Sequence, residues 1–174
     1  MKRLILFAAL VGLFAWSPGA DVQASDLEQN CADAMALFME TDDSLKDFFD
    51  SSYGYAIFPN VGKGGMGLGG AHGKGLVYRN GEIVGRTSLT QFTVGFQFGG
   101  QVYQQAIFFE NDRAYTDFTG GNFELSAQAS AIAAAAGVAA NAKYRHGVAI
   151  FTLGKGGLMY EASVGGQKFS FTPL

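Results

Sequence analysis

The chain has 174 residues, of which 48% are hydrophobic and 16% are charged, and this composition is typical of one globular domain with its own core. Its 25 glycines, 16 phenylalanines and only 3 prolines favour β-sheet over disorder. The formal net charge is −3, and no stretch concentrates basic residues as a nucleic-acid-binding face requires, which argues against nucleic acid as a partner.

Residues 1–24 are predicted to be a cleaved signal peptide. Lys2 and Arg3 precede an apolar run, Leu4 to Trp16, that is too short to span a bilayer comfortably. Val22-Gln23-Ala24 is a suitable cleavage tripeptide, so the mature chain is expected to begin at Ser25. An uncleaved membrane anchor is the alternative. We therefore expect a periplasmic or secreted protein whose residues 25–174 form a single domain.

Charge divides this domain into two parts. Residues 26–50 contain eight acidic residues and one lysine, a net charge of −7. Residues 51–174 contain nine basic and six acidic residues, a net charge of +3. The sequence thus predicts an acidic helical lead-in over residues 25–52 and a mildly basic, β-rich body over residues 53–174.

Two helices are predicted in the lead-in. Over residues 26–40, apolar residues recur every three or four positions, as on one face of an amphipathic helix: Leu27, Cys31, Ala34, Met35 and Phe38. The single Cys31 can form no intrachain disulfide, and the residues before it do not fit a lipid-attachment motif. A second short helix is expected over residues 43–50.

The period changes to two at Tyr53, which indicates strand. A turn is predicted at Pro59-Asn60, followed by a strand over residues 65–70 with one face of bare glycine. Asn80-Gly81 lies between two apolar runs and predicts a β-hairpin. Residues 92–98 alternate as a strand, and residues 102–109 are expected to pair with it.

The last third of the chain gives mixed signals. Residues 111–118 predict a helix with Asn111 as its N-cap and Gly120-Gly121 as its end. Residues 123–142 begin with strand-like alternation but contain an alanine run that favours helix, so both structures stay open. Residues 144–153, 157–164 and 167–171 are predicted strands.

Glycine-rich residues 62–70 match the pattern of a dinucleotide-binding loop twice, but strand rather than helix follows them, which argues against nucleotide binding. His72 and His146 have no partner at metal-ligand spacing, and no serine lies in a nucleophile-elbow context. We expect no metal, no cofactor and no enzymatic activity.

Six basic residues lie near glycine turns and beside apolar residues: Lys63, Lys74, Arg79, Arg86, Lys155 and Lys168. Basic and apolar side chains together suit an anionic lipid headgroup and its acyl chain. Each of these residues alone could equally be an ordinary surface residue at a turn. If they share one side of a sheet, they form a candidate lipid-binding site.

Several ordered motifs resemble the SYLF lipid-binding domain family. They are Tyr53 to Val61, Lys63-Gly64-Gly65, Gly69-Gly70-Ala71, Gly73-Lys74-Gly75, Phe96 to Gln101, the stretch Phe118 to Phe123, Gly156 to Glu161 and Gly165 to Phe169. The resemblance covers about residues 26–174, and the leader makes the chain similar to a bacterial exported member.

The resemblance implies an α+β fold with N-terminal helices packed on a strongly bent, mostly antiparallel or barrel-like sheet, and it favours strand for much of residues 123–137. It also implies phospholipid binding; the phosphoinositides and actin of eukaryotic members do not suit an exported bacterial protein. We therefore expect a non-catalytic domain that binds phospholipid or a membrane surface. The alternative is a structural or protein-interaction module of the cell envelope, with a protein partner.

Overall fold

The computed structural model describes residues 18–66, 68–94, 101–121, 124–125, 131–133, 138–155, 157–161 and 166–174. In this part of the chain, the helices are α1 (Pro18–Thr41), α2 (Leu45–Ser51), α3 (Asp112–Thr119) and α4 (Val138–Asn141). The strands are β1 (Gly54–Met66), β2 (Leu68–Arg79), β3 (Glu82–Val94), β4 (Gln101–Phe109), β5 (Glu124–Leu125), β6 (Ala131–Ala133), β7 (Val148–Gly154), β8 (Gly157–Glu161) and β9 (Gln167–Pro173). Among the described residues, no helix is long and apolar enough to cross a bilayer.

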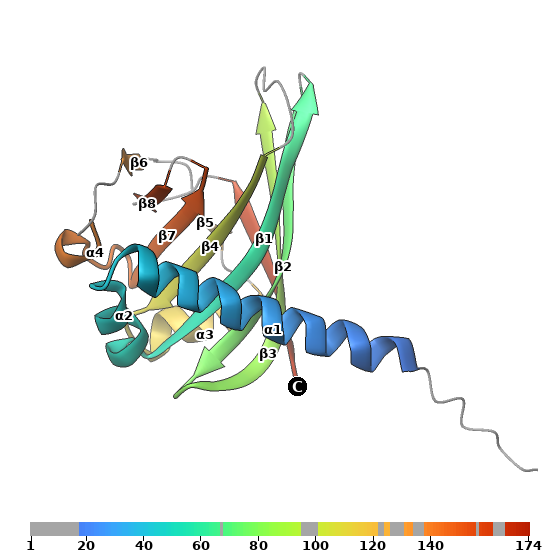
Figure 1. Cartoon of the computed structure of the whole chain (residues 1–174), viewed down its shortest axis with the longest axis horizontal. Helices are drawn as coiled ribbons and strands as arrows, with labels where there is room; N and C mark the ends of the chain where they lie inside the picture. The colour runs from blue at the N-terminus through green and yellow to red at the C-terminus, as the bar shows by residue number, and fades with distance from the viewer. Residues whose placement is uncertain are drawn as a thin grey trace, which may run out of the picture.

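The strands form one sheet in the order β5-β9-β3-β2-β1-β4-β7-β8-β6, and each described pairing is antiparallel. Two helices, α1 and α2, precede the sheet in the chain and pack on it (Figure 1), so the predicted α+β class is confirmed. The sheet is open, with the short strands β5 and β6 at its two ends. The barrel-like alternative is therefore not what the described residues form.

The two faces of the sheet are buried by different helices. On the face that we call outer, Cys31 and Phe38 of α1 pack with Ile57, Leu76 and Phe108. The opposite, inner face carries α3, whose Ala114 and Phe118 belong to a second core cluster that includes these residues of the strands: Phe58, Val77, Leu89, Ile107, Phe109, Val148, Ile150 and Phe169. Strand side chains alternate between these faces with a period of two.

The sheet curls around its inner face. Gln105 of β4 donates a hydrogen bond from Nε2 to Oε1 of Gln167 on β9 at 3.0 Å, although β1, β2 and β3 separate these strands in the sheet. Phe58 of β1 and Phe169 of β9 are likewise in ring contact across this face, with centroids 5.8 Å apart. The strong bend that the sequence predicted is thus confirmed.

Glycine permits this bend where β2 passes β1. A Cβ at Gly75 would clash with the carbonyl oxygen of Ile57 and lie 2.8 Å from Cδ1 of Phe58, and a Cβ at Gly73 would lie 2.9 Å from Cγ2 of Val61. The glycine-rich stretch is therefore a closely packed part of a sheet and not a phosphate-binding loop.

Three expectations for the strands were wrong. Pro59-Asn60 is no turn: β1 continues through it, and the pairing register shifts between Ile57 and Asn60 as in a β-bulge. Residues 65–70 are not one strand, because β1 ends at Met66 and β2 returns from Leu68. In the described chain β4 pairs with β1 and β7, not with the strand expected to begin at residue 92.

Other expectations were confirmed. The Asn80-Gly81 hairpin joins β2 to β3, with φ of 53° and 79° at the two residues, and Asn111 caps α3 through a 3.1 Å hydrogen bond from the Ala114 amide. The open segment 123–142 is strand at β5 and β6 and helix at α4, where it is described. The rest of that segment and residues 95–100 lie outside the described residues, as do residues 1–17 of the predicted signal peptide.

Candidate functional site

Three of the six basic residues share one exposed surface. Lys74 lies two positions before Leu76 on β2, so its side chain is on the outer face, and Arg86 and Lys168 lie on the same face of β3 and β9. All three side chains are exposed, and among the described residues none of them is in an ion pair. We call Lys74, Arg86 and Lys168 the basic outer face.

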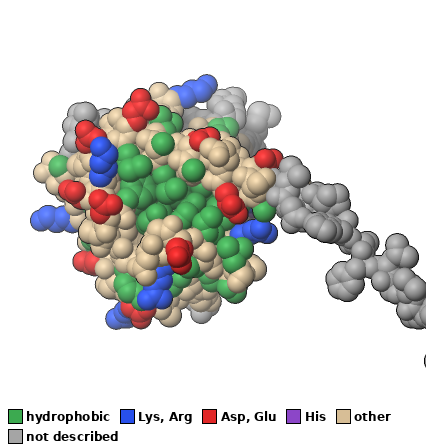
Figure 2. Space-filling model, turned by 60° about the horizontal axis from the view of Figure 1, so that its bottom comes forward, with side chains coloured by type: hydrophobic (Ala, Val, Ile, Leu, Met, Phe, Trp, Pro, Cys, Tyr) green, Lys and Arg blue, Asp and Glu red, His purple; other side chains and the backbone are tan. Residues whose placement is uncertain are grey.

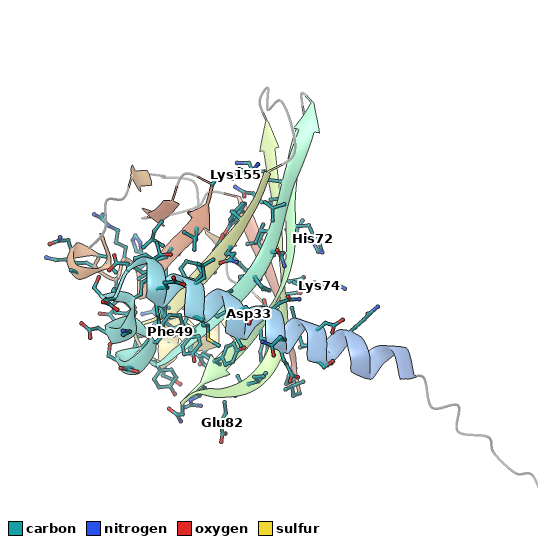
Figure 3. The ribbon with its side chains drawn as sticks, in the orientation of Figure 1. Asp33, Phe49, His72, Lys74, Glu82 and Lys155 are labelled. Atoms are coloured by element: carbon teal, nitrogen blue, oxygen red, sulfur yellow. The ribbon has the colours of Figure 1, made fainter. Side chains whose placement is uncertain are left out.

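The strands of the basic outer face carry hydroxyl groups and little acid, and the acidic helix α1 packs on the same face of the sheet. Ser88 stands opposite both Lys74 and Ser170, and the two serine Oγ atoms are 2.6 Å apart. Glu82 is the single acidic residue of β2, β3 and β9, and it lies at the hairpin end. Figure 3 shows Lys74 projecting from β2 far from Glu82. This part of the sheet therefore presents cations and hydrogen-bond donors to solvent.

A β-bulge places Arg86 on this face. The hairpin pairs Arg79 with Glu82, but the register shifts between Val77 and Tyr78, so Arg86 stands opposite Leu76 of the outer face. Without the extra residue in β3, Arg86 would stand opposite Gly75 and point to the inner face.

Lys63 and Lys155 are not part of the basic outer face. Lys63 follows Val61 by two positions on β1, which places it on the inner face, where it is half-buried. Lys155 is exposed in the turn between β7 and β8, apart from Lys74 in Figure 3.

Arg79 is held in an aromatic cluster at the end of β2. Its guanidinium carbon lies 4.6 Å from the ring centroid of Tyr53 and 5.6 Å from that of Tyr115, and Nη2 donates a hydrogen bond to the Tyr53 hydroxyl. Tyr53 in turn donates to Oδ1 of Asp112 at 2.7 Å, and this hydrogen bond raises the pKa of Tyr53. Arg79 therefore ties β1 and β2 to the start of α3 and is not a free cation.

A buried layer of glutamines on the inner face escaped the sequence interpretation. Gln105 and Gln167 exchange amide hydrogen bonds of 3.0 and 3.2 Å, and Gln167 also donates to Oε1 of Gln91 at 3.4 Å. Gln105 and Gln167 are fully buried. The period of two in the sequence could have located these glutamines on the inner face. Each lies two positions along its strand from an apolar residue that is buried there: Leu89, Ile107 and Phe169.

An aromatic row crosses the outer face near the β2–β3 hairpin. Phe49 of α2 contacts Tyr55 edge-on at 5.1 Å, Tyr55 stacks on Tyr78 at 5.0 Å, and Tyr78 stands opposite Ile83. Figure 2, which brings the bottom of Figure 1 forward, shows hydrophobic side chains gathered at the centre of this end with charged side chains around them. Phe49 and Ile83 are partly exposed.

Candidate metal ligands do not converge. Among the described residues, no group of three or more histidine, cysteine, aspartate or glutamate side chains could hold a metal ion. His72 is exposed on β2, and His146 is exposed in the turn before β7.

Comparison with known proteins finds one family and one relative to which the chain is similar. Residues 90–172 match the Ysc84 family, also called SYLF, whose description is "Las17-binding protein actin regulator". Over these residues the chain is similar to the SYLF family. It is also similar to Beta cell expansion factor A of Aeromonas veronii, with 31% identity over 128 residues, which are 72% of this chain and 48% of that relative. The chain thus spans about half the length of this relative.

These matches confirm the resemblance found in the sequence and support a binding domain. The matched SYLF residues 90–172 include Lys155 and Lys168. Lys74 and Arg86 lie before the matched region, yet the sheet brings them to the same face as Lys168.

Proposed function

We propose that this SYLF domain is an exported, non-catalytic phospholipid-binding protein that contacts anionic membrane surfaces through its basic outer face. The observation that supports the proposal is the shared, exposed face of Lys74, Arg86 and Lys168, whose three strands carry no acidic residue beside them. Each lysine or arginine near an anionic membrane surface contributes about 1 kcal/mol of attraction. The hydroxyl groups of Ser88 and Ser170 add hydrogen-bond donors for phosphate oxygens.

Export is supported by how α1 is packed. The predicted cleavage after Ala24 lies within α1, and residues 23–30 of that helix include no buried side chain. The first fully buried residue is Cys31. Removal of residues 1–24 would therefore leave the packed part of the helix intact.

The test is co-sedimentation of the protein with vesicles of phosphatidylglycerol and phosphatidylcholine. We expect binding to the anionic vesicles that weakens as salt rises, because the Debye length falls from about 8 Å at 0.15 M to about 3 Å at 1 M. The triple variant Lys74→Glu, Arg86→Glu, Lys168→Glu should lose this binding. A matched variant, Lys46→Glu, Arg113→Glu, Arg145→Glu, carries the same charge change at other exposed positions and should bind more strongly than the first.

Equal loss in the two triple variants would show that net charge and not this face governs binding. Absence of salt-sensitive binding to anionic vesicles by the parent protein would refute the proposed function. Arg79→Gln provides a further control: because Arg79 is held by Tyr53 and Tyr115, it should lower stability without a specific effect on vesicle binding.

The aromatic row supports a second candidate function, a protein-interaction module of the cell envelope. Tyrosine and phenylalanine are enriched at protein interfaces, and Phe49 and Ile83, at the two ends of the aromatic row, are partly exposed. Capture of one envelope protein that is lost in Phe49→Ser but kept in the basic-face triple variant, without added lipid, would favour this function.

A further inference from the structure

The register of the sheet aligns cations from different strands. Gly62 of β1 stands opposite His72 of β2, which stands opposite Thr90 of β3, which stands opposite Lys168 of β9. Lys63 is the next residue of β1 and points to the other face. Lys168 on the outer face and Lys63 on the inner face therefore lie at nearly the same height along the strands.

A third cation lies at this height on the other side of β1. Val102 of β4 stands opposite Gly62, and a Cβ at Gly154 would lie 3.7 Å from Cβ of Tyr103, the residue after Val102. Lys155 follows Gly154 in the turn between β7 and β8. The sheet thus carries one level of positive charge, which we call the cationic row: Lys63, Lys155 and Lys168.

Past the cationic row, three strands continue without charge. β1 and β2 stay paired from Lys63 and Ala71 up to Met66 and Leu68, and β2 and β3 stay paired up to Leu68 and Val94. We call the described residues 64–66, 68–70 and 92–94 the ribbon tip. Residues 64–71 and 87–109 contain no aspartate, glutamate, lysine or arginine. Charge therefore ends at the cationic row.

The ribbon tip projects beyond the other strands and the helices that the structure describes (Figure 1). Figure 1 shows the far ends of β1 and β3 beyond β4, β7 and the helices. A Cβ at Gly64 would have no atom within 4 Å, and Val102, at the foot of the tip, is 60% exposed. The tip is thus a projecting, uncharged end of the sheet with an exposed apolar residue at its base.

The dimensions fit a shallow membrane contact. The three residues of β1 beyond Lys63 extend about 10 Å at 3.3 Å per residue, which matches the 5–10 Å depth of interfacial elements at the headgroup and acyl boundary. In the described chain, the pairing of β1 with β4 reaches as far as Lys63 and Gln101.

We propose that the SYLF sheet docks end-on, with the ribbon tip inserted among the phospholipid headgroups of an anionic bilayer and the cationic row at the phosphate level. This inference rests on the proposed function and specifies its orientation. It makes Lys63 and Lys155, which lie off the basic outer face, part of the contact. It also orders the basic outer face by depth: Lys168 is nearest to the bilayer, Lys74 is next, and Arg86 is farthest.

The order has a measurable consequence. Successive outer-face rows are two residues, or about 7 Å, apart, so Arg86 lies about 14 Å below Lys168. This exceeds the Debye length of about 8 Å at 0.15 M salt. Lys168→Glu should therefore weaken binding to phosphatidylglycerol vesicles about fivefold or more, and Arg86→Glu should change it little. A sheet lying flat on its basic outer face would lose similar affinity in both variants.

Insertion is tested directly with single tryptophans. Trp16 is the one tryptophan of the sequence, so the full chain with Trp16→Phe has no tryptophan fluorescence of its own, whether or not the leader is removed. Gly64→Trp places a reporter on the ribbon tip, where a Cβ would meet no atom within 4 Å, and Val102→Trp places one at its foot. Leu37→Trp, at a 41% exposed position of α1, is the matched control.

With phosphatidylglycerol vesicles, emission from the Gly64→Trp variant should shift to the blue and be quenched by lipids brominated on the acyl chain. The Val102→Trp variant should respond less, and the Leu37→Trp variant should not respond. Inorganic phosphate at the same phosphate concentration should neither shift the emission nor compete. Salt-sensitive binding without a response of the tip reporter, or with a larger response of the α1 reporter, would overturn end-on docking and leave the proposed function standing. Absence of vesicle binding by the parent would refute both.

Discussion

Gly75 is a residue whose missing side chain decides how closely two strands pack. A Cβ there would meet the Ile57 carbonyl oxygen and the Phe58 ring at the β-bulge of β1. Gly64, on the same hairpin, has no such neighbours. The high glycine content of this stretch thus has different physical reasons at different positions, and only some of these glycines are required for packing.

We predict that Gly75→Ala lowers the free energy of unfolding by about 1–3 kcal/mol, the usual cost of an overpacked core. Gly64→Ala is the matched control and should be neutral or stabilising by up to about 1 kcal/mol, because alanine restricts the unfolded chain where the native site has room. Urea unfolding followed by circular dichroism measures both. Equal stability of the two variants would contradict the close packing of β2 on β1.

At the scale of elements, α1 is fixed to the sheet around Cys31. Its Sγ lies 3.6 Å from the carbonyl oxygen of Ile57, to which it donates, and burial raises the pKa of the thiol from an ordinary 9.0 to about 12. Burial also raises the pKa of Tyr144 to about 12 and the pKa values of Tyr55 and Tyr78. The core on the outer face thus favours neutral forms of all four groups.

These shifts set the alkaline limit of stability. A group whose pKa is higher in the folded state than in the unfolded state stabilises the fold below its unfolded pKa, and this contribution is lost as the pH rises through its folded pKa. We therefore predict that the free energy of unfolding falls between about pH 9 and pH 12. Cys31→Ala should reduce the slope of the free energy of unfolding against pH, measured by urea titrations at successive pH values.

The native thiol should also resist a disulfide reagent at pH 8 that labels the unfolded chain at once, and rapid native labelling would contradict the packing of α1.

β-Bulges explain most of what the sequence could and could not predict about the elements. Helix periodicity and the Asn80-Gly81 signal act over a few residues, so α1, α3 and the β2–β3 hairpin were predicted correctly. Pro59 suggested a turn because proline interrupts a strand ladder, but here it lies within the register shift of β1, where a missing N–H is tolerated. The bulge at Val77 likewise put Arg86 beside Lys74, which no local pattern indicates.

Pairings between distant strands set the remaining part of the candidate site. The partner of β4 is β1, almost fifty residues earlier, and β9 joins β3 from the C-terminus, so Lys168 reaches the basic outer face only through long-range pairing. The glutamine layer depends on the same curl, because Gln105 meets Gln167 only when β9 lies across from β4. Local periodicity indicates that a residue lies in a strand, but it does not indicate which other strand pairs with that strand.

At the scale of the whole molecule, the acidic and the basic parts of the sequence lie in different places in the fold. The acidic residues 26–50, with a net charge of −7, form α1 and α2, which cover the outer face away from the ribbon tip. End-on docking keeps this negative charge away from an anionic bilayer, whereas docking through α1 would bring it close. The acidic helices and the cationic row therefore both favour the proposed orientation.

The same view leads to a prediction about processing. The N-terminal turns of α1 project beyond the sheet in Figure 1, and the side chains of residues 23–30 are not buried. We predict that the exported protein begins at Ser25, as intact-mass measurement would show. Because Cys31, Ala34 and Phe38 remain in place, its free energy of unfolding should lie within about 0.5 kcal/mol of that of the unprocessed chain, the range of changes outside packed regions. A large loss of stability on cleavage after Ala24 would contradict this account, because it would show that the projecting turns belong to the packed fold. A mature N-terminus beyond Cys31 would also contradict it, because cleavage would then remove a buried residue of the core.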